Sequence, residues 1–158
     1  MFSLQGKVAI VTGASRGIGR SIALGFAAAG ADVGVAARSE GDLKELADEI
    51  SDLGRRAVVL PTDVTSRDQI QNMVDTCVAE LGGLDILVNN AGGTRFMSPL
   101  VGLRADGWDK VIGLNLDSVF HATQIGANAM LERGGGSIIQ IASVAGISGA
   151  QGLSFYSA

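Results

Sequence analysis

The sequence has little cysteine and no excess of basic residues. Cys77 is the only cysteine among 158 residues, so no disulfide can form within the chain and nothing indicates an oxidising compartment. Twelve Lys and Arg residues stand against sixteen Asp and Glu residues, which gives a net charge of −4 without any basic block. Such a balance argues against nucleic-acid binding. We therefore expect a cytoplasmic protein that has no nucleic-acid partner.

Apolar runs that could cross a bilayer are also missing. Residues 134–158 carry no charge, but glycine, serine and glutamine interrupt them too often for a segment that must lie in hydrocarbon. The first seven residues lack the charged and apolar regions of a secretory signal. The sequence therefore predicts a protein without a membrane partner.

What the sequence has in abundance is glycine, with 23 residues, and small apolar side chains within a hydrophobic share of 47%. This composition and length predict one domain over residues 1–158 with a single sizeable core. Short apolar runs rich in Val and Ile alternate with longer amphipathic segments, which is the rhythm of a βαβ fold. The runs that we expect to form strands are residues 8–11, 32–36, 57–60, 86–88 and 137–141.

The segments between these runs predict helices. Apolar residues recur at helical spacing over 43–53 and 70–81, capping side chains precede the second segment at 63–66, and glycines at 54 and 82 follow the two segments. A longer helix over about 104–132 contains Gly113 and Asn115, which indicate a bend. The architecture that we expect is an α/β fold with a Rossmann-type, doubly wound parallel sheet. In such a sheet the ligand binds outside the carboxyl ends of the strands.

A glycine-rich turn follows the first expected strand. Residues 12–19 read TGASRGIG, and a helix follows them. Glycines at a strand end let backbone N–H groups approach a pyrophosphate, which then lies at the positive end of the helix. Gly13, Gly17 and Gly19 would form such a turn here. Their spacing differs from the G-x-G-x-x-G fingerprint, and the turn lacks the Lys and Ser/Thr of a P-loop.

The end of the second expected strand bears on the choice of cofactor. An acidic residue there usually binds the ribose 2′-hydroxyl of NAD, but this sequence has Arg38 and Ser39. Arg38, together with Arg16 of the glycine turn, could form charge-assisted bonds to a 2′-phosphate. The sequence therefore favours NADP over NAD, although Glu40 or Asp42 could still reach the ribose.

Several motifs resemble those of the short-chain dehydrogenase/reductase family, and the sequence is most similar in style to the 3-oxoacyl-acyl-carrier-protein reductases. Residues 12–19 resemble the family's T-G-x-x-x-G-I-G cofactor turn, residues 63–64 its adenine-contacting D-V pair, and residues 89–92 its N-N-A-G signature. Asn115, Ser143 and Tyr156 fall where the family keeps its active-site Asn, Ser and Tyr. The resemblance covers residues 8–158. The cofactor-binding residues expected from these motifs are Gly13, Ser15, Arg16, Gly17, Ile18, Gly19, Arg38, Ser39, Asp63, Val64, Asn89, Ala91, Gly92 and Tyr156.

The chemistry of such a site needs a positioned acid, because hydride transfer to a carbonyl leaves an alkoxide. We expect Tyr156 to be this acid, Ser143 to hydrogen-bond the carbonyl oxygen, and Asn115 to support a water chain to bulk solvent. The resemblance implies an NAD(P)-dependent oxidoreductase that interconverts a small-molecule ketone and a secondary alcohol, with a 3-oxoacyl thioester as one candidate substrate. It also implies a homo-oligomer, either a tetramer or a dimer. No metal is expected, since His121 has no Cys, Asp or Glu placed to complete a site with it.

The sequence departs from the family pattern at its end. It stops at Ala158, so it lacks the lysine that the family has four residues after the tyrosine, the rest of that helix, the substrate loop and two further strands with their helix. The segment 137–141 would then be an exposed apolar edge. Two interpretations stay open: the sequence is part of a longer reductase, which we favour, or it is a short chain that holds NADP without turnover.

Overall fold

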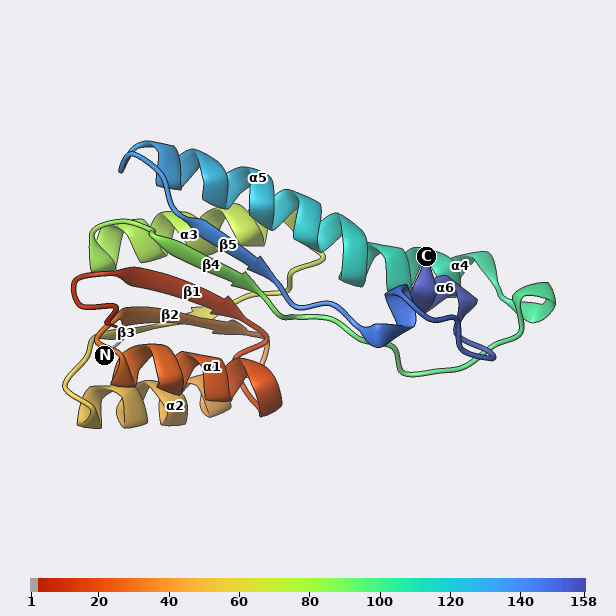
Figure 1. Ribbon diagram of the computed structural model, residues 1–158, viewed down its shortest axis with the longest axis horizontal. Coiled ribbons are helices and arrows are strands. Elements are labelled where there is room, and N and C mark those ends of the chain that lie inside the picture. The colour runs from red at the N-terminus through yellow and green to blue at the C-terminus, as the bar shows by residue number, and fades with distance from the viewer. Residues whose placement is uncertain (1–2) are drawn as a thin grey trace.

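A sheet of five parallel strands, in the order β3-β2-β1-β4-β5, forms the centre of the computed structural model, which describes residues 3–158 (Figure 1). The strands are β1 (Val8–Thr12), β2 (Asp32–Ala37), β3 (Ala57–Pro61), β4 (Ile86–Asn89) and β5 (Ser137–Gln140). All five predicted strands are confirmed, and each ends within one residue of the expected position. The winding direction reverses between β1 and β4, as in the predicted doubly wound sheet.

Helices cover both faces of the sheet. α1 (Gly17–Ala28) and α2 (Glu40–Asp52) lie on one face, and α3 (Arg67–Leu81) and α5 (Ser118–Leu131) lie on the other (Figure 1). Successive side chains of a strand point to opposite faces. Ile10 therefore packs with residues of α3 and α5, whereas Ala9 and Val11 pack with residues of α1 and α2. The amphipathic segments form helices here because the sheet covers their apolar sides.

The ends of α3 follow the predicted capping pattern. The hydroxyl oxygen of Ser66 accepts a hydrogen bond from the N–H of Gln69 at 3.4 Å, which satisfies one of the unpaired donors at the start of the helix. Gly82 follows α3 with a φ of 90°, a left-handed conformation that favours glycine. These two residues fix where α3 begins and where the chain turns toward β4.

The long helix predicted over 104–132 consists of three parts. α4 (Ala105–Ile112) is followed by a π-helical segment (Gly113–Asp117) and then by α5. The bend expected at Gly113 and Asn115 is therefore a widened helical turn and not a break in the helix. Such turns inside α-helices occur frequently at functional sites.

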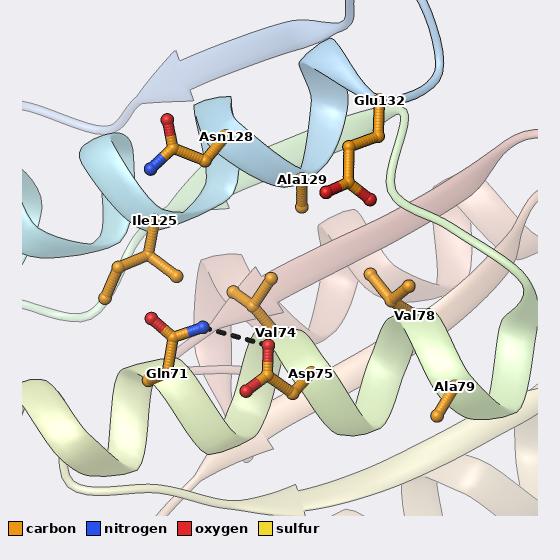
Figure 2. A pocket seen from close by; sticks show the side chains of 9 residues that line it. All are labelled: Gln71, Val74, Asp75, Val78, Ala79, Ile125, Asn128, Ala129 and Glu132. Carbon is orange, nitrogen blue, oxygen red and sulfur yellow. Dashed lines mark hydrogen bonds between the residues drawn. The ribbon is translucent and has the colours of Figure 1, made fainter.

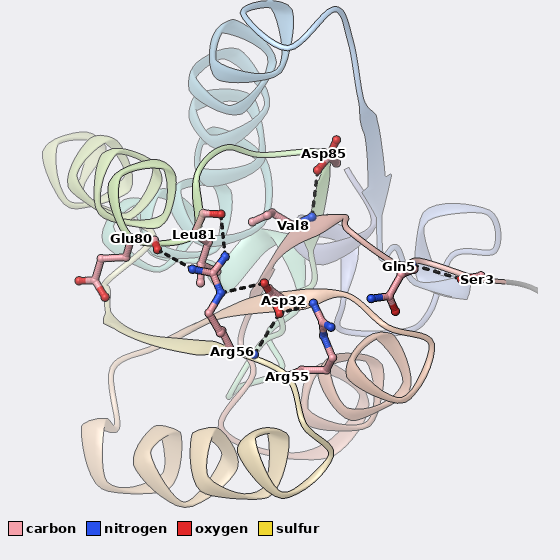
Figure 3. A network of polar contacts seen from close by, with 9 residues as sticks. All are labelled: Ser3, Gln5, Val8, Asp32, Arg55, Arg56, Glu80, Leu81 and Asp85. Atoms are coloured by element: carbon pink, nitrogen blue, oxygen red, sulfur yellow. Dashed lines mark hydrogen bonds and ion pairs between the residues drawn. The ribbon is translucent and has the colours of Figure 1, made fainter.

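A charge network holds the amino end of the sheet (Figure 3). Asp32 starts β2 and accepts hydrogen bonds from the Arg55 side chain at 2.6 Å and from the backbone N–H and Nε of Arg56, each at 3.0 Å. Burial acts to raise the pKa of Asp32, but the hydrogen bonds from Arg56 and the charges of Arg55 and Arg56 together outweigh it and hold this pKa below its ordinary value. Asp85, just before β4, accepts from the N–H of Val8 at 2.9 Å. These contacts align the starts of the strands.

A smaller part of the chain extends beyond the carboxyl ends of the strands (Figure 1). It contains α4, two 3₁₀ turns (Leu100–Gly102 and Val144–Gly146) and α6 (Ser154–Ser157), which contacts α4. β5 pairs with β4 alone, and Ile139 and Ile141 are each 39% exposed, so the expected apolar edge is present. Within residues 3–158, no helix has both the length and the apolar character that crossing a membrane needs.

Candidate active site

Polar residues gather at the carboxyl edge of the sheet because all the strands run in one direction. Thr12 ends β1 and Asn90 follows β4, while Arg38, Asp63 and Ser143 come after β2, β3 and β5. Parallel strands end at the same edge of a sheet, so these residues belong to one end of the core. This is the edge at which the sequence predicts ligand binding.

Thr12 and Asn90 join β1 to β4 at this edge. The Thr12 hydroxyl donates to the carbonyl oxygen of Val88 at 3.2 Å and accepts from the N–H groups of Asn90 and Ala91 at 3.0 and 3.1 Å. The side-chain amide of Asn90 donates to the carbonyl oxygens of Thr12 and Gly13 at 2.9 and 3.3 Å. The start of the glycine turn is thus tied to the end of β4.

The glycine turn between β1 and α1 is crowded on its inner side and open on its outer side. Gly13 and Gly17 have φ values of 66° and 58°, which favour glycine. A Cβ atom on Gly19 would overlap the carbonyl oxygen of Gly13 and would lie 2.5 Å from Nδ2 of Asn90. A Cβ atom on Gly17 would meet no atom within 4 Å. The turn therefore packs against Asn90 and leaves its outer backbone accessible to a ligand.

The N-terminus of α1 carries no negative charge of its own. α2 has Glu40 and Asp42 in its first turn and α3 has Asp68, whereas α1 has neither an acidic residue there nor a side-chain cap. The first N–H groups of a helix have no partner within the helix, and the helix dipole attracts anions to them. Arg16 precedes α1 and is exposed, as is Ile18 within the first turn. This end of α1 therefore suits a phosphate group.

The residues after β2 and β3 form a second part of the expected cofactor site. Arg38 and Ser39 are exposed, and α2 begins directly after them. Asp63 accepts from the N–H and the hydroxyl of Thr65 at 3.0 and 2.7 Å. These hydrogen bonds hold the pKa of Asp63 below its ordinary value although burial opposes them, and the positive charge of Arg38 adds to the effect. Arg38 and Asp63 are therefore electrostatic neighbours.

Three of the expected cofactor residues, Gly19, Val64 and Asn89, are buried. Val64 is 8% exposed, and Asn89 is 4% exposed. The side-chain amide of Asn89 donates to the Thr123 hydroxyl at 3.3 Å. Because these side chains are turned away from solvent, a ligand would meet the backbone of these positions. Ala91 already uses its N–H to bond the Thr12 hydroxyl.

Asn115 lies in the π-helical segment and binds the loop that leaves β4. Its Oδ1 accepts from the N–H of Gly93 at 2.6 Å, and its Nδ2 donates to the carbonyl oxygens of Gly93 and Val111 at 3.0 and 2.8 Å. A Cβ atom on Gly92 would lie 2.9 Å from Oδ1, so glycine at this position allows the loop to approach. One side chain thus connects the widened helical turn to the loop.

Ser143 and Tyr156 both lie in the part of the chain after β5. The hydroxyl oxygen of Ser143 accepts from the N–H of Ala145 at 3.1 Å, which leaves the hydroxyl proton available for a ligand. Tyr156 lies in α6 and is half-buried. α6 contacts the 3₁₀ turn that follows Ser143, and it also contacts α4. The two residues therefore come from neighbouring segments.

A comparison with protein families shows which family contains this chain. Residues 7–158 match the family model described as short chain dehydrogenase. The chain belongs to the short-chain dehydrogenase family. The matched range includes the glycine turn, residues 89–92, and both Ser143 and Tyr156.

Individual relatives support this family membership. The short chain dehydrogenase/reductase astE of Aspergillus oryzae is 46% identical over 144 residues, which are 90% of this chain and 55% of that protein. The 3-oxoacyl-acyl-carrier-protein reductase FabG of Thermotoga maritima is 41% identical over 155 residues, which are 98% of this chain and 63% of that protein. The structure of a 7α-hydroxysteroid dehydrogenase complexed with NADH and 7-oxo glycochenodeoxycholic acid has a TM-score of 0.94 at 37% identity, with 99% of this chain and 60% of that chain covered. The chain thus spans about 60% of the length of the relatives it matches.

Thr12 is the first residue of the glycine motif, but it is not among the cofactor-binding residues expected from that motif. It is 2% exposed and makes three hydrogen bonds, to Val88, Asn90 and Ala91. One feature of the sequence could have indicated its role: Thr12 is a hydroxyl residue at the end of an otherwise apolar strand. A hydroxyl that is buried there needs hydrogen-bond partners. Those partners lie on β4 and cannot be read from the residues around Thr12.

A groove between α3 and α5 lies outside the candidate active site (Figure 2). It has a volume of about 310 Å³ and is lined by apolar residues such as Val74 and Ile125 together with the carboxylates of Asp75 and Glu132. None of the expected site residues lines it. Residues 3–158 also contain no cluster of three or more His, Cys, Asp or Glu side chains that could hold a metal. The carboxyl edge of the sheet therefore remains the candidate site.

Proposed function

We propose that this protein is an oxidoreductase that prefers NADP(H) and interconverts a ketone and a secondary alcohol. Family membership supports this function, and so does one observation. The glycine turn, Arg38, Ser143 and the segment of Tyr156 all follow strands that end at the same edge of the sheet. A dinucleotide bound outside this edge would cross the point at which the strand order reverses, as ligands of doubly wound sheets do.

The residues of the glycine turn fit a dinucleotide. Gly13 and Gly17 have positive φ values, and the outer side of Gly17 is open, so backbone N–H groups can come close to a pyrophosphate. The uncapped N-terminus of α1, which includes Ile18 and Gly19, would complete the phosphate site. Ser15 lies beside it in the same turn.

The preference for NADP is supported by Arg16 and Arg38. Both are exposed at the carboxyl edge, where guanidinium groups can form paired hydrogen bonds with a phosphate. Arg38 follows β2 directly, and Ser39 separates it from the first carboxylate, Glu40. The related 7α-hydroxysteroid dehydrogenase structure contains NADH, so family membership alone is compatible with either cofactor.

Three side chains would take part in substrate binding and proton transfer. When bound, the reduced nicotinamide supplies a hydride to the carbonyl carbon. Ser143 would donate to the carbonyl oxygen, since its own oxygen already accepts from a backbone N–H. Tyr156 would give its phenolic proton to the same oxygen as negative charge grows there. Both amide protons of Asn115 are already bonded, so only its Oδ1 could receive a further hydrogen bond from a water of the relay.

A 3-oxoacyl thioester is the candidate substrate that we would test first. FabG, a 3-oxoacyl-acyl-carrier-protein reductase, is among the relatives. Close to Ser143, Val144 is 76% exposed and Ile147 is 92% exposed. Such side chains suit a substrate with an apolar portion.

We also propose that the protein works as a homo-oligomer, a tetramer or a dimer, in the cytoplasm. Trp108 on α4, Leu116 in the π-helical segment and Phe120 on α5 expose large apolar side chains. Exposed apolar surface of this kind is typical of subunit contacts. Sedimentation should therefore show a multiple of the protomer mass, and a monomer at every concentration would contradict this part.

The substitution Tyr156→Phe tests the proposed reaction. The full-length wild-type protein should consume NADPH when ethyl acetoacetate or an acetoacetyl thioester is added. Tyr156→Phe should lower turnover about a hundredfold or more, because the proton donor is lost, and should leave NADPH affinity in calorimetry nearly unchanged. Ser148→Ala, which removes an exposed hydroxyl outside the expected site, is the control.

Two results would contradict this function. Full turnover by Tyr156→Phe would exclude the tyrosine as the acid. NADPH binding by the wild-type protein without consumption of NADPH by any ketone would instead favour a module that holds NADP and catalyses nothing.

A further inference from the structure

The loop 93–99, which connects β4 to the 3₁₀ turn before α4, is bonded to two of the proposed catalytic segments. Near its start, the N–H of Gly93 donates to Oδ1 of Asn115 at 2.6 Å. Near its end, the N–H of Ser98 donates to the carbonyl oxygen of Gly152 at 2.9 Å. Gly152 lies in the turn that leads into α6. The loop therefore runs from Asn115 to the segment that carries Tyr156.

Phe96, in the middle of this loop, stacks on the residue that precedes Tyr156. The rings of Phe96 and Phe155 have centroids 4.7 Å apart and planes inclined by 12°. Phe155 is 1% exposed, whereas Phe96 is 37% exposed. A Cβ atom on Gly107 would lie 3.2 Å from Cζ of Phe96, so the ring also packs against α4. Phe96 thus lies in contact with both α4 and α6.

This stack is one of the contacts that hold α6, which also contacts α4 and the 3₁₀ turn after Ser143. Phe155 is the only buried residue of α6 within the range that the structure describes. Tyr156 lies in the first turn of α6, and its N–H donates to the carbonyl oxygen of Leu153 at 2.9 Å, so the chain that enters the helix sets the direction of this side chain. The Thr94 hydroxyl donates to the carbonyl oxygen of Phe96 at 3.1 Å and so restrains the backbone of the loop under the ring.

We propose that Phe96 is a positioning residue for Tyr156. Its ring holds Phe155, and through Phe155 it fixes the first turn of α6, so that the phenol meets the substrate oxygen in one geometry. The effect on turnover rests on the proposed function of Tyr156 as the acid. Displacement of a catalytic group by about 1 Å can cost about a hundredfold in rate, so loss of the stack should affect catalysis more than cofactor binding.

Tyr156 provides a direct readout, because in protein labelled with 3-fluorotyrosine the fluorine NMR signal that disappears in Tyr156→Phe belongs to this residue. Phe96→Ala should shift this signal toward its position in the unfolded chain and narrow it. The same variant should lower kcat with ethyl acetoacetate about tenfold or more, while KM and Kd for NADPH stay within about twofold of the wild-type values. Phe96→Trp retains an aromatic ring and should restore both the signal and kcat.

The matched control is Leu53→Ala, which removes an apolar side chain that is 48% exposed at the C-terminal end of α2, a helix that is not among those in contact with α6. It should leave the fluorine signal unchanged. If Phe96→Ala does not fold, Phe96→Leu removes the aromatic ring but keeps apolar volume and should show the same two effects in weaker form.

The results separate this inference from the proposed function. An unchanged fluorine signal in Phe96→Ala would overturn the positioning role, whatever the activity. A fall in NADPH affinity as large as the fall in kcat would also overturn it, because it would indicate a general loss of structure. If the wild-type protein reduces no ketone, the proposed function fails, and the fluorine signal still decides whether Phe96 holds Tyr156.

Discussion

Asn90 and Thr12 are 78 residues apart in the sequence and are joined by two hydrogen bonds, from the backbone N–H of Asn90 to the Thr12 hydroxyl and from Nδ2 of Asn90 to the Thr12 carbonyl oxygen. The two residues come from β1 and from the end of β4, the strands between which the winding direction reverses. The same amide reaches Gly13 at 3.3 Å. The shape of the expected pyrophosphate site is therefore set by a residue from the other half of the sheet.

Gly19→Ala should damage this arrangement. Its Cβ atom would overlap the Gly13 carbonyl oxygen and approach Nδ2 of Asn90 to 2.5 Å. Because the first neighbour is a backbone atom and the second is a side-chain amide held by two hydrogen bonds, the turn must move. We expect a loss of about 1–3 kcal/mol in the free energy of unfolding and a weaker affinity for NADPH, measured by urea unfolding and by calorimetry.

Gly25→Ala is the matched control, because Gly25 lies in the same helix and a Cβ atom there would meet nothing within 4 Å. It should raise the free energy of unfolding by about 0.5–1 kcal/mol, since alanine loses less backbone entropy in a helix than glycine. Equal effects of the two substitutions on the free energy of unfolding would show that the hydrogen bonds between Asn90 and the glycine turn do not constrain position 19.

The fold was predictable because its signals are local. Continuous apolar runs indicated strands covered on both faces, and the apolar spacing in 43–53 and 70–81 indicated one-sided helices. Gly113 and Asn115 predicted a bend for the same reason. The π-helical form of that bend could not be predicted, because it is accompanied by two hydrogen bonds between Asn115 and Gly93, 22 residues away.

The parts of the site that the sequence did not reveal depend on contacts between distant residues. The motifs named Ser143 and Tyr156, but no periodicity relates Phe96 to Phe155 or Thr12 to Asn90. The sequence also could not predict that Asn89 is buried, because its hydrogen-bond partner Thr123 lies on α5. Sequence patterns therefore predict which residues form the site, while the contacts that hold these residues in place are seen only in the three-dimensional packing.

Asp32→Asn should make the protein less stable near neutral pH but not in acid. The native pKa of Asp32 is lowered, so the ionised carboxylate stabilises the native state above its unfolded pKa of about 4, and this contribution is lost as the pH falls through the native pKa. At pH 7 the substitution should cost about 2 kcal/mol, because Arg55 and Arg56 lose a charged acceptor. The two proteins should converge in urea unfolding as the pH falls through the native pKa of Asp32.

The exposed carboxylate of Asp106 provides the comparison. Its side chain is 52% exposed and is paired with Arg104 and Lys110, so solvent and salt screen it. Asp106→Asn should leave the free energy of unfolding nearly unchanged from pH 3 to pH 7. An equal loss of unfolding free energy in both variants would mean that the Asp32 network contributes no more to stability than a surface ion pair does.

Cys77 should be unreactive in the native protein. It is fully buried, and burial, with a smaller effect from the charge of Glu80, raises the pKa of its thiol to about 12. The thiolate is the reactive form, so a disulfide reagent such as DTNB should not label native protein at pH 8 and should label one thiol per chain in urea. Rapid labelling without denaturant would show that α3 opens from the sheet.

Arg38→Asp should change the choice between NADPH and NADH. Arg38 is exposed directly after β2, and its positive charge is felt at Asp63, so a carboxylate at this position would add a second negative charge where a 2′-phosphate would bind. We expect Kd for NADPH to rise about 10- to 100-fold and Kd for NADH to change less than about threefold, both measured by calorimetry. Lys110→Asp alters the net charge by the same amount on α4 and should affect neither value. Equal weakening of NADPH and NADH by Arg38→Asp would exclude a role for this arginine in phosphate recognition.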